Sequence, residues 1–235
     1  MNRDRNKLYC FSPLVMITTF AIEISLAVYT LWRYHLNEVT RIVFSLLVLL
    51  ATFQLAEYIV CEGPLGGSAL WSRIGFVAIT LLPPLGIHLV YALAKADRRP
   101  LLLPAYGTGA AFSVFFVAVS TAFAGHVCAG NYVIFDVTPG MGGWFAAYYY
   151  GWLLAAVLLA RHYGLRSNSA RLRRSLSALS IGYAAFIVPT ATVNLISPDT
   201  IKAIPSIMCG FAVILAVVLV VAVLPGMAKL RGSHE

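Results

Sequence analysis

The sequence predicts an all-α integral membrane protein built as a seven-helix bundle. Of its 235 residues, 60% are hydrophobic and only 11% are charged, and the mean hydropathy is +0.83. That composition leaves too few polar side chains to cover a water-soluble domain. Apolar stretches of about 20 residues, the length needed to cross a bilayer, recur along the chain.

Seven spans follow from these stretches, joined mostly by short loops. They are 13–31, 42–60, 71–94, 101–124, 143–162, 176–196 and 204–224. The chain then divides into an extracytoplasmic N-terminal segment at 1–12, a seven-transmembrane-helix domain at 13–224, and a cytoplasmic tail at 225–235.

The first span follows a basic segment, so a cleaved signal peptide is the alternative to a true helix. The span is long, contains Glu23, and has no clear small-residue cleavage site before the next polar loop. We therefore predict a retained helix. Glu23 falls near its middle and is expected to face the bundle in a structural hydrogen bond rather than a proton relay.

The second span ends in a run of polar side chains on one helical face. Gln54, Glu57, Tyr58 and Cys61 recur at i, i+3, i+4 and i+7. A carboxylate at that depth needs a partner, and Arg73 begins the next span at a similar depth. Two interpretations stay open: a Glu57–Arg73 ion pair that fixes two helices, or a ligand-binding role.

The third span contains the stretch ITLLPPLGIHLVYA. Pro83 and Pro84 lack the backbone donors that would reach the carbonyls of Ile79 and Thr80. In a bilayer the freed carbonyls must find partners on neighbouring helices, side chains or water, so this segment should face the bundle interior. Near mid-membrane, the double proline is predicted to act as a hinge.

His88 is the one histidine placed in the interior of a span, since His162 is the last residue of the fifth span, so we expect a satisfied buried side chain rather than a ligand. A lone histidine cannot build a zinc site or ligate haem on both faces. The seventh span has no lysine for a retinal Schiff base. The sequence therefore predicts no metal, no cofactor and no enzymatic activity.

The loop at 125–142 is the long one, and its residues 132–137 alternate as in a strand. It is expected to form a short strand or to lie as a cover across the bundle mouth. Cys61 and Cys128 both fall in predicted outer loops. They either form a disulfide or are two small apolar residues at helix ends, and both readings stay open.

Polar residues of the fifth and sixth spans are expected to join Glu57. They are Tyr148 and Tyr149 in the fifth span and Thr190 and Asn194 in the sixth, whereas Trp71 and Trp144 suit an interfacial belt. The predicted ligand-binding residues are Gln54, Glu57, Tyr58, Arg73, Tyr148 and Asn194.

Orientation follows from the lysines and arginines. Twelve flank the spans on one side and five on the other. The positive-inside rule then puts the N-terminus outside and the C-terminus in the cytoplasm, in the inner (plasma) membrane. Because the basic residues are scattered over short loops, they predict no nucleic-acid surface.

The run WSRIGFVAITLLPPLGIHLVYALA, after a second span that ends in a short acidic loop, resembles the N-terminal seven-helix sensor region of bacterial membrane histidine kinases and some diguanylate cyclases. The Trp-x-Arg start, the mid-span prolines, the long outer loop and the basic loop LRSNSARLRRS carry the resemblance. It implies a sensor that binds a small ligand, lipid or peptide near its outer face. The chain ends eleven residues after the seventh span, so the output domain belongs to a separate partner protein, or the chain is a fragment.

A small-solute or proton-coupled transporter is the alternative, with Glu23, Glu57 and His88 as its polar path. An inverted repeat would place matching breaks in both halves, and Pro83-Pro84 and Pro189 do not match. A lipid-modifying membrane enzyme and a structural subunit of a larger complex are further alternatives.

Overall fold

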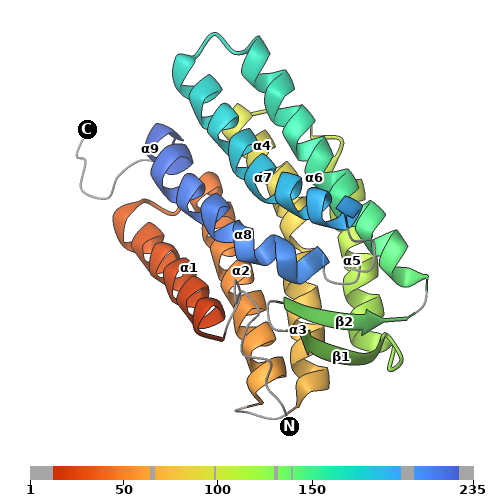
Figure 1. Ribbon diagram of the computed structural model, residues 1–235. Helices are drawn as coiled ribbons and strands as arrows, with labels where there is room; N and C mark the ends of the chain where they lie inside the picture. The colour runs from red at the N-terminus through yellow and green to blue at the C-terminus, as the bar shows by residue number, and fades with distance from the viewer. Residues whose placement is uncertain are drawn as a thin grey trace.

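The computed structural model describes residues 13–63, 67–97, 99–129, 132–138, 140–196 and 204–227. Over these ranges the chain is a helical bundle with one β-hairpin at one end (Figure 1). The predicted segment at 1–12, and residues 228–235 of the predicted tail, lie outside the described residues.

Seven helical segments run through the described residues, two of them interrupted. They are α1 (Pro13–Arg33), α2 (Glu38–Glu62), α3 (Ser68–Thr80) continued by α4 (Leu82–Ala94), α5 (Leu102–Ala118), α6 (Met141–Arg166), α7 (Ala170–Ile196), and α8 (Ile204–Val218) continued through a π-helical turn (Leu219–Val223) into α9 (Leu224–Met227). Five of the segments are long and apolar enough to cross a membrane, and α5 and the α8–α9 segment are shorter apolar helices. These segments define a multi-pass helical membrane protein.

The fourth span ends earlier than the sequence predicts. The apolar run to residue 124 was expected to stay helical, but α5 ends at Ala118 and β1 begins at Phe123. Short apolar runs fit a helix and a strand equally well, so hydropathy cannot place this boundary. The strand expected at 132–137 is confirmed as β2 (Tyr132–Val137), which pairs antiparallel with β1 (Phe123–Ala129).

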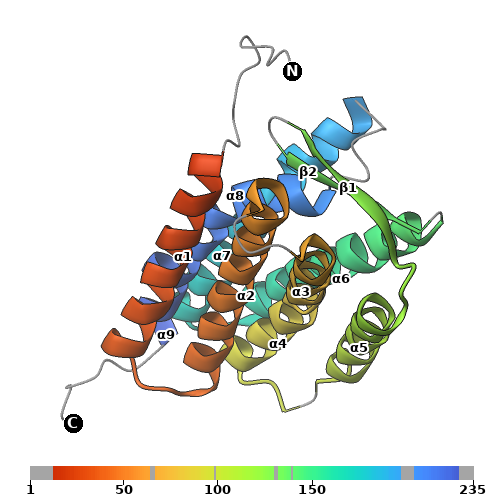
Figure 2. The same cartoon turned by 90° about the horizontal axis from the view of Figure 1, so that it is seen from below.

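The helices are packed so that α2 and α4 lie at the centre. Helix α1 contacts α2 and α8, helix α6 contacts α4 and α7, and α5 contacts α3 and α4 at the side away from α1 (Figure 2). Because consecutive segments run antiparallel, their connections alternate between two ends. We call the end that carries β1 and β2 the hairpin end, and the end with the connections at 34–37, 95–101 and 167–169 the arginine-rich end.

The hairpin is fixed to the bundle in two ways. A disulfide joins Cys61 at the end of α2 to Cys128 in β1, which decides between the two readings left open by the sequence. Phe135 of β2 is 1% exposed, and its ring lies 5.1 Å from that of Phe76 in α3 and 6.3 Å from that of Phe53 in α2. The hairpin therefore covers an aromatic core rather than an open mouth.

Candidate functional site

The double proline interrupts the third span at Leu81, between α3 and α4. Pro83 and Pro84 are buried, as the sequence predicts for a break that faces the interior. The hydroxyl of Tyr148 on α6 donates a 2.6 Å hydrogen bond to the Thr80 carbonyl, the acceptor that Pro84 leaves without its helical donor. The expectation that the break needs a donor from another helix is thereby met.

Two glycines allow neighbouring helices to approach this break. A Cβ on Gly86 of α4 would overlap the hydroxyl of Tyr183 on α7. A Cβ on Gly109 of α5 would lie 3.0 Å from the Tyr148 hydroxyl and 3.1 Å from Pro84. Helices α4, α5, α6 and α7 thus meet at one junction, which we call the proline junction.

A second group of polar residues is buried between α1 and α2. Glu23 of α1 is 0% exposed, and Gln54 and Glu57 of α2 are 3% and 2% exposed. Within the described residues, neither carboxyl oxygen of Glu23 has a hydrogen-bond partner, and Nε2 of Gln54 has none. Buried polar groups without partners are costly and rare, so this group, the buried acidic layer, is the strongest candidate binding site.

Arg73 does not bind Glu57. Its guanidinium donates to the carbonyls of Phe116 and Val117 at 2.9 and 2.6 Å and to that of Ser120 at 3.2 Å. These are the last carbonyls of α5 and its following turn, which lack helical donors. The interpretation of Glu57 and Arg73 as an ion pair is therefore wrong. The charge of Arg73 instead stabilises the C-terminus of α5.

The other predicted binding residues are not gathered into one site. Tyr58 is half-buried on α2, Tyr148 belongs to the proline junction, and the side chain of Asn194 lies outside the described residues. Arg73 also borders an open groove of about 360 Å³ between α2, α3 and α5. Its other lining residues are mainly apolar: Leu49, Thr52, Leu70, Ile74, Val77, Ala78 and Val117.

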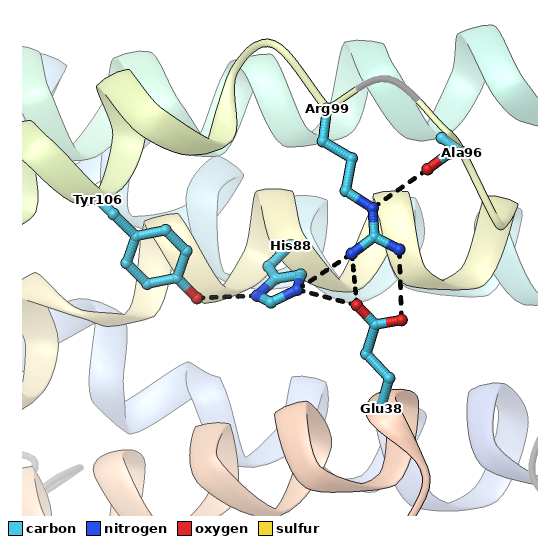
Figure 3. A network of polar contacts seen from close by, with 5 residues as sticks. All are labelled: Glu38, His88, Ala96, Arg99 and Tyr106. Atoms are coloured by element: carbon cyan, nitrogen blue, oxygen red, sulfur yellow. Dashed lines mark hydrogen bonds and ion pairs between the residues drawn. The ribbon is translucent and has the colours of Figure 1, made fainter.

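A polar network lies at the arginine-rich end (Figure 3). Glu38, the first residue of α2, accepts hydrogen bonds from Nη1 and Nη2 of Arg99, the latter at 3.3 Å. Its Oε1 also lies 3.1 Å from Nε2 of His88 on α4, whose Nδ1 lies 3.0 Å from the hydroxyl of Tyr106 on α5. Since a carboxylate only accepts, Nε2 of His88 carries the proton, and in neutral His88 Nδ1 accepts from Tyr106.

Local structure places Glu38 for this network. The side chain of Asn37 caps α2 by accepting from the Thr40 amide at 2.9 Å, which starts the helix at Glu38. The hydrogen bonds that Arg99 donates to the Glu38 carboxylate raise the pKa of Arg99 above its usual value, so the guanidinium stays charged. The Glu38 and Arg99 side chains are 48% and 28% exposed, so water weakens the pair.

The network confirms that His88 has hydrogen-bond partners, but its side chain is 24% exposed, so the expectation that it is buried is wrong. Sequence reasoning missed the partners Glu38, Arg99 and Tyr106. The available signal was Asn37-Glu38, an N-cap followed by a first-turn acid, at the same predicted end as the basic loop DRRP.

Over the described residues, no group of three or more His, Cys, Asp or Glu side chains is placed to hold a metal ion. Comparison of the chain with protein-family models, with curated proteins and with solved structures returned no match. The fold and the buried polar groups thus define the class, a multi-pass helical membrane protein.

Proposed function

We propose that the protein is a non-enzymatic membrane receptor that binds a small ligand, lipid or peptide in its hairpin half and relays a conformational signal to the arginine-rich end. One observation carries the proposal. The helix that joins the two ends is broken at mid-length, and the freed Thr80 carbonyl is held by the Tyr148 hydroxyl from another helix.

A single side-chain hydrogen bond is a suitable element for a relay because it has two discrete states, made and broken. When Tyr148 holds Thr80, α3 and α6 are tied at the break between α3 and α4. Breaking the hydrogen bond between Tyr148 and Thr80 would let α4 tilt relative to α3. This tilt would move His88, which belongs to α4, together with its polar network. The glycine contacts at Gly86 and Gly109 limit this motion to small sliding of packed helices.

For the stimulus we favour the buried acidic layer, with the groove beside Arg73 as the entry for a lipid. Gln54 and Glu57 lie in the half of α2 nearer the hairpin, and Glu23 lies at the middle of α1. Among the described residues, Glu23 and Gln54 retain unmet hydrogen-bonding capacity. A ligand that satisfied these groups would bind one arrangement of the helices better than the other. That difference in affinity is what drives a conformational equilibrium.

We place the hairpin end outside the cell and the arginine-rich end in the cytoplasm, in the plasma (inner) membrane. Two independent features support this orientation. The twelve-to-five distribution of lysine and arginine follows the positive-inside rule. The Cys61–Cys128 disulfide belongs to the hairpin end, and disulfides persist in oxidising compartments.

The output would pass to a separate signalling protein docked on the cytoplasmic arginines. Arg161, Arg166, Arg171, Arg173 and Arg174 are all exposed on α6 and α7. The resemblance to histidine-kinase sensor regions implies the same arrangement, in which the membrane domain senses the stimulus and another domain produces the output.

Proton-coupled transport is the second candidate, because Glu57, Glu23 and the His88 network lie at successive depths. The buried face of α2 argues against a continuous path. Between Gln54 and Glu38 it presents the apolar side chains Val43, Leu46, Leu47, Leu50 and Phe53, all at most 3% exposed. Protein reconstituted in vesicles should therefore carry no proton flux. A flux that Glu23→Gln abolishes would favour transport instead.

The receptor proposal is tested by thermal unfolding in nanodiscs against amino acids, short peptides, fatty acids and phospholipids. At least one compound should stabilise wild type more than Glu57→Ala, while the exposed control Glu62→Ala responds as wild type does. If every compound acts equally on wild type and Glu57→Ala, the proposed site is not the binding site.

A further inference from the structure

Glu23 is the most deeply buried ionisable residue among those that the structure describes, and it lies on the face of α1 that packs inward. Met16, Thr19, Ala27 and Thr30 share this face and are at most 7% exposed. The hydroxyls of Thr19 and Thr30 donate to carbonyls of their own helix, at 2.9 and 2.8 Å, so they do not donate to Glu23. Both carboxyl oxygens of Glu23 thus remain without a donor among the described residues.

Glu57 of α2 lies close enough to Glu23 for their charges to interact. The antiparallel packing explains why. Side chains lean toward the N-terminus of their own helix, so Glu23 leans toward the hairpin end and Glu57 leans away from it. Gln54 lies one turn before Glu57 on the same face, and its Nε2 lacks an acceptor in the described part of the chain.

Helix α1 packs against α2 and α8, and these two helices decide what faces Glu23. From α2 the charged neighbour is Glu57, an acid that would repel an ionised Glu23. The described side chains of α8, residues 211–218, read FAVILAVV and contain no titratable group. No cation among these described residues can therefore neutralise Glu23.

We propose that Glu23 is a proton-binding site: the closed bundle holds it as the neutral acid, and its ionisation loosens α1 from α2 and α8. The proposal rests on the receptor function above and names the proton as its stimulus. A proton needs no cavity, which suits a side chain with 0% exposure. Burying an unpaired carboxylate is strongly unfavourable, whereas the neutral acid avoids most of that cost.

Loosening is expected at α1 rather than elsewhere because α1 is held on one face only. Leu14, Val28 and Trp32 on its other faces are 75%, 61% and 72% exposed. The Cys61–Cys128 disulfide fixes α2 to the hairpin, but α1 has no such link in its described residues. A charge on Glu23 would thus be relieved by water entering between α1 and α2.

The first test is infrared difference spectroscopy of the whole protein in nanodiscs during a pH titration. Wild type at neutral pH should show a protonated-carboxyl band that is absent in Glu23→Gln and retained in the exposed control Glu62→Gln. Wild type without that band, or Glu23→Gln with the band unchanged, would overturn the proposal. A wild-type spectrum without the band overturns the proposal even if a variant fails to fold.

The second test measures movement of α1 with spin labels at Val28→Cys on α1 and Leu165→Cys at the end of α6, both exposed sites. The background carries Cys10→Ser and Cys209→Ser. The label distance should change as pH rises with Glu23 present and stay constant in Glu23→Gln. The same pH response with and without Glu23 would refute the proposal.

These outcomes separate the proton site from the receptor function. If the acid band and the α1 movement occur but labels at the arginine-rich end report no change, the proton site is correct and the relay is wrong. If ligands from the compound panel drive the relay and Glu23 shows no acid band, the receptor function holds and the proton site is wrong.

Discussion

The hydroxyl of Tyr148 lies 2.6 Å from the carbonyl oxygen of Thr80, and this contact joins α6 to the proline junction. Tyr148 is 8% exposed and Thr80 is 0% exposed, so water cannot readily replace the bond. Replacing Tyr148→Phe removes the donor and leaves a buried carbonyl unpaired, which should cost about 1–3 kcal/mol of stability.

The measurement is the unfolding free energy in mixed detergent micelles. Tyr29→Phe is the matched control, because Tyr29 is 41% exposed on α1 and its ring contacts do not need the hydroxyl. If Tyr148→Phe and Tyr29→Phe lower the free energy of unfolding equally, the hydrogen bond from Tyr148 to the Thr80 carbonyl does not stabilise the fold.

Gly86→Ala should destabilise the bundle, because a Cβ there would overlap the hydroxyl of Tyr183, a side chain only 2% exposed that cannot swing away. Gly107→Ala in α5 should be neutral or stabilising by up to about 1 kcal/mol, since alanine favours helix and no atom lies within 4 Å of the added carbon. Thermal unfolding should show a lower Tm for Gly86→Ala and an unchanged or higher Tm for Gly107→Ala. A lower Tm in both variants, or in neither, would contradict the packing at the proline junction.

The Cys61–Cys128 disulfide closes a loop with a sequence separation of 67 residues. Replacing both with serine should lower stability by at most about 4 kcal/mol, the loop-entropy limit for a chain of that length, and less if the membrane already restricts the unfolded chain. Reductant should shift the mobility of wild type but not of the double variant on gels. A Cys209→Ser variant that lost the shift would assign the bridge to a different cysteine.

Arg73 and Glu57 should show no energetic coupling. Arg73→Gln removes three hydrogen bonds to the end of α5, so it should destabilise by about 1.5–3 kcal/mol even though the side chain is only partly buried. A double-mutant cycle with Glu57→Gln isolates any direct interaction. The expected coupling is within about 0.5 kcal/mol of zero, and a clearly larger value would restore the ion pair.

The Glu38–Arg99 pair should contribute little despite its geometry. Both side chains are partly exposed, at 48% and 28%, so a cycle of Glu38→Gln and Arg99→Gln should give a coupling energy of about 0.2–1 kcal/mol that falls with added salt. Arg41→Gln, an exposed arginine on the same helix as Glu38, is the control. A coupling that does not respond to salt would mean that the pair is shielded from solvent.

Much of the fold follows from local patterns that a sequence displays directly. Hydropathy placed all seven helical segments, alternation placed β2 at 132–137, and the predicted loop positions of Cys61 and Cys128 on the same side of the membrane allowed their disulfide. The end of α5 was predicted wrongly because the apolar run that follows it suits a strand as well as a helix.

The proline chemistry was also readable in advance. Proline removes a specific donor wherever it occurs in a helix, so the sequence determined that a carbonyl near residue 80 would need a partner from outside its own helix. The tertiary structure decided that the partner is Tyr148, 68 residues away. That choice depends on the rotation and depth of α6 beside α3.

The partners of the charged residues were likewise decided by the tertiary structure. The similar depth of Glu57 and Arg73 in the membrane suggested that they pair, but depth does not determine the direction in which a side chain points. The Arg73 side chain points to carbonyls 43 to 47 residues further along the chain. Glu38 meets His88 and Arg99 across 50 and 61 residues. Helical periodicity sets which side chains share a face of one helix. The packing of several helices decides which faces meet, and that packing alone brought these groups together and left Glu23 without a donor among the described residues.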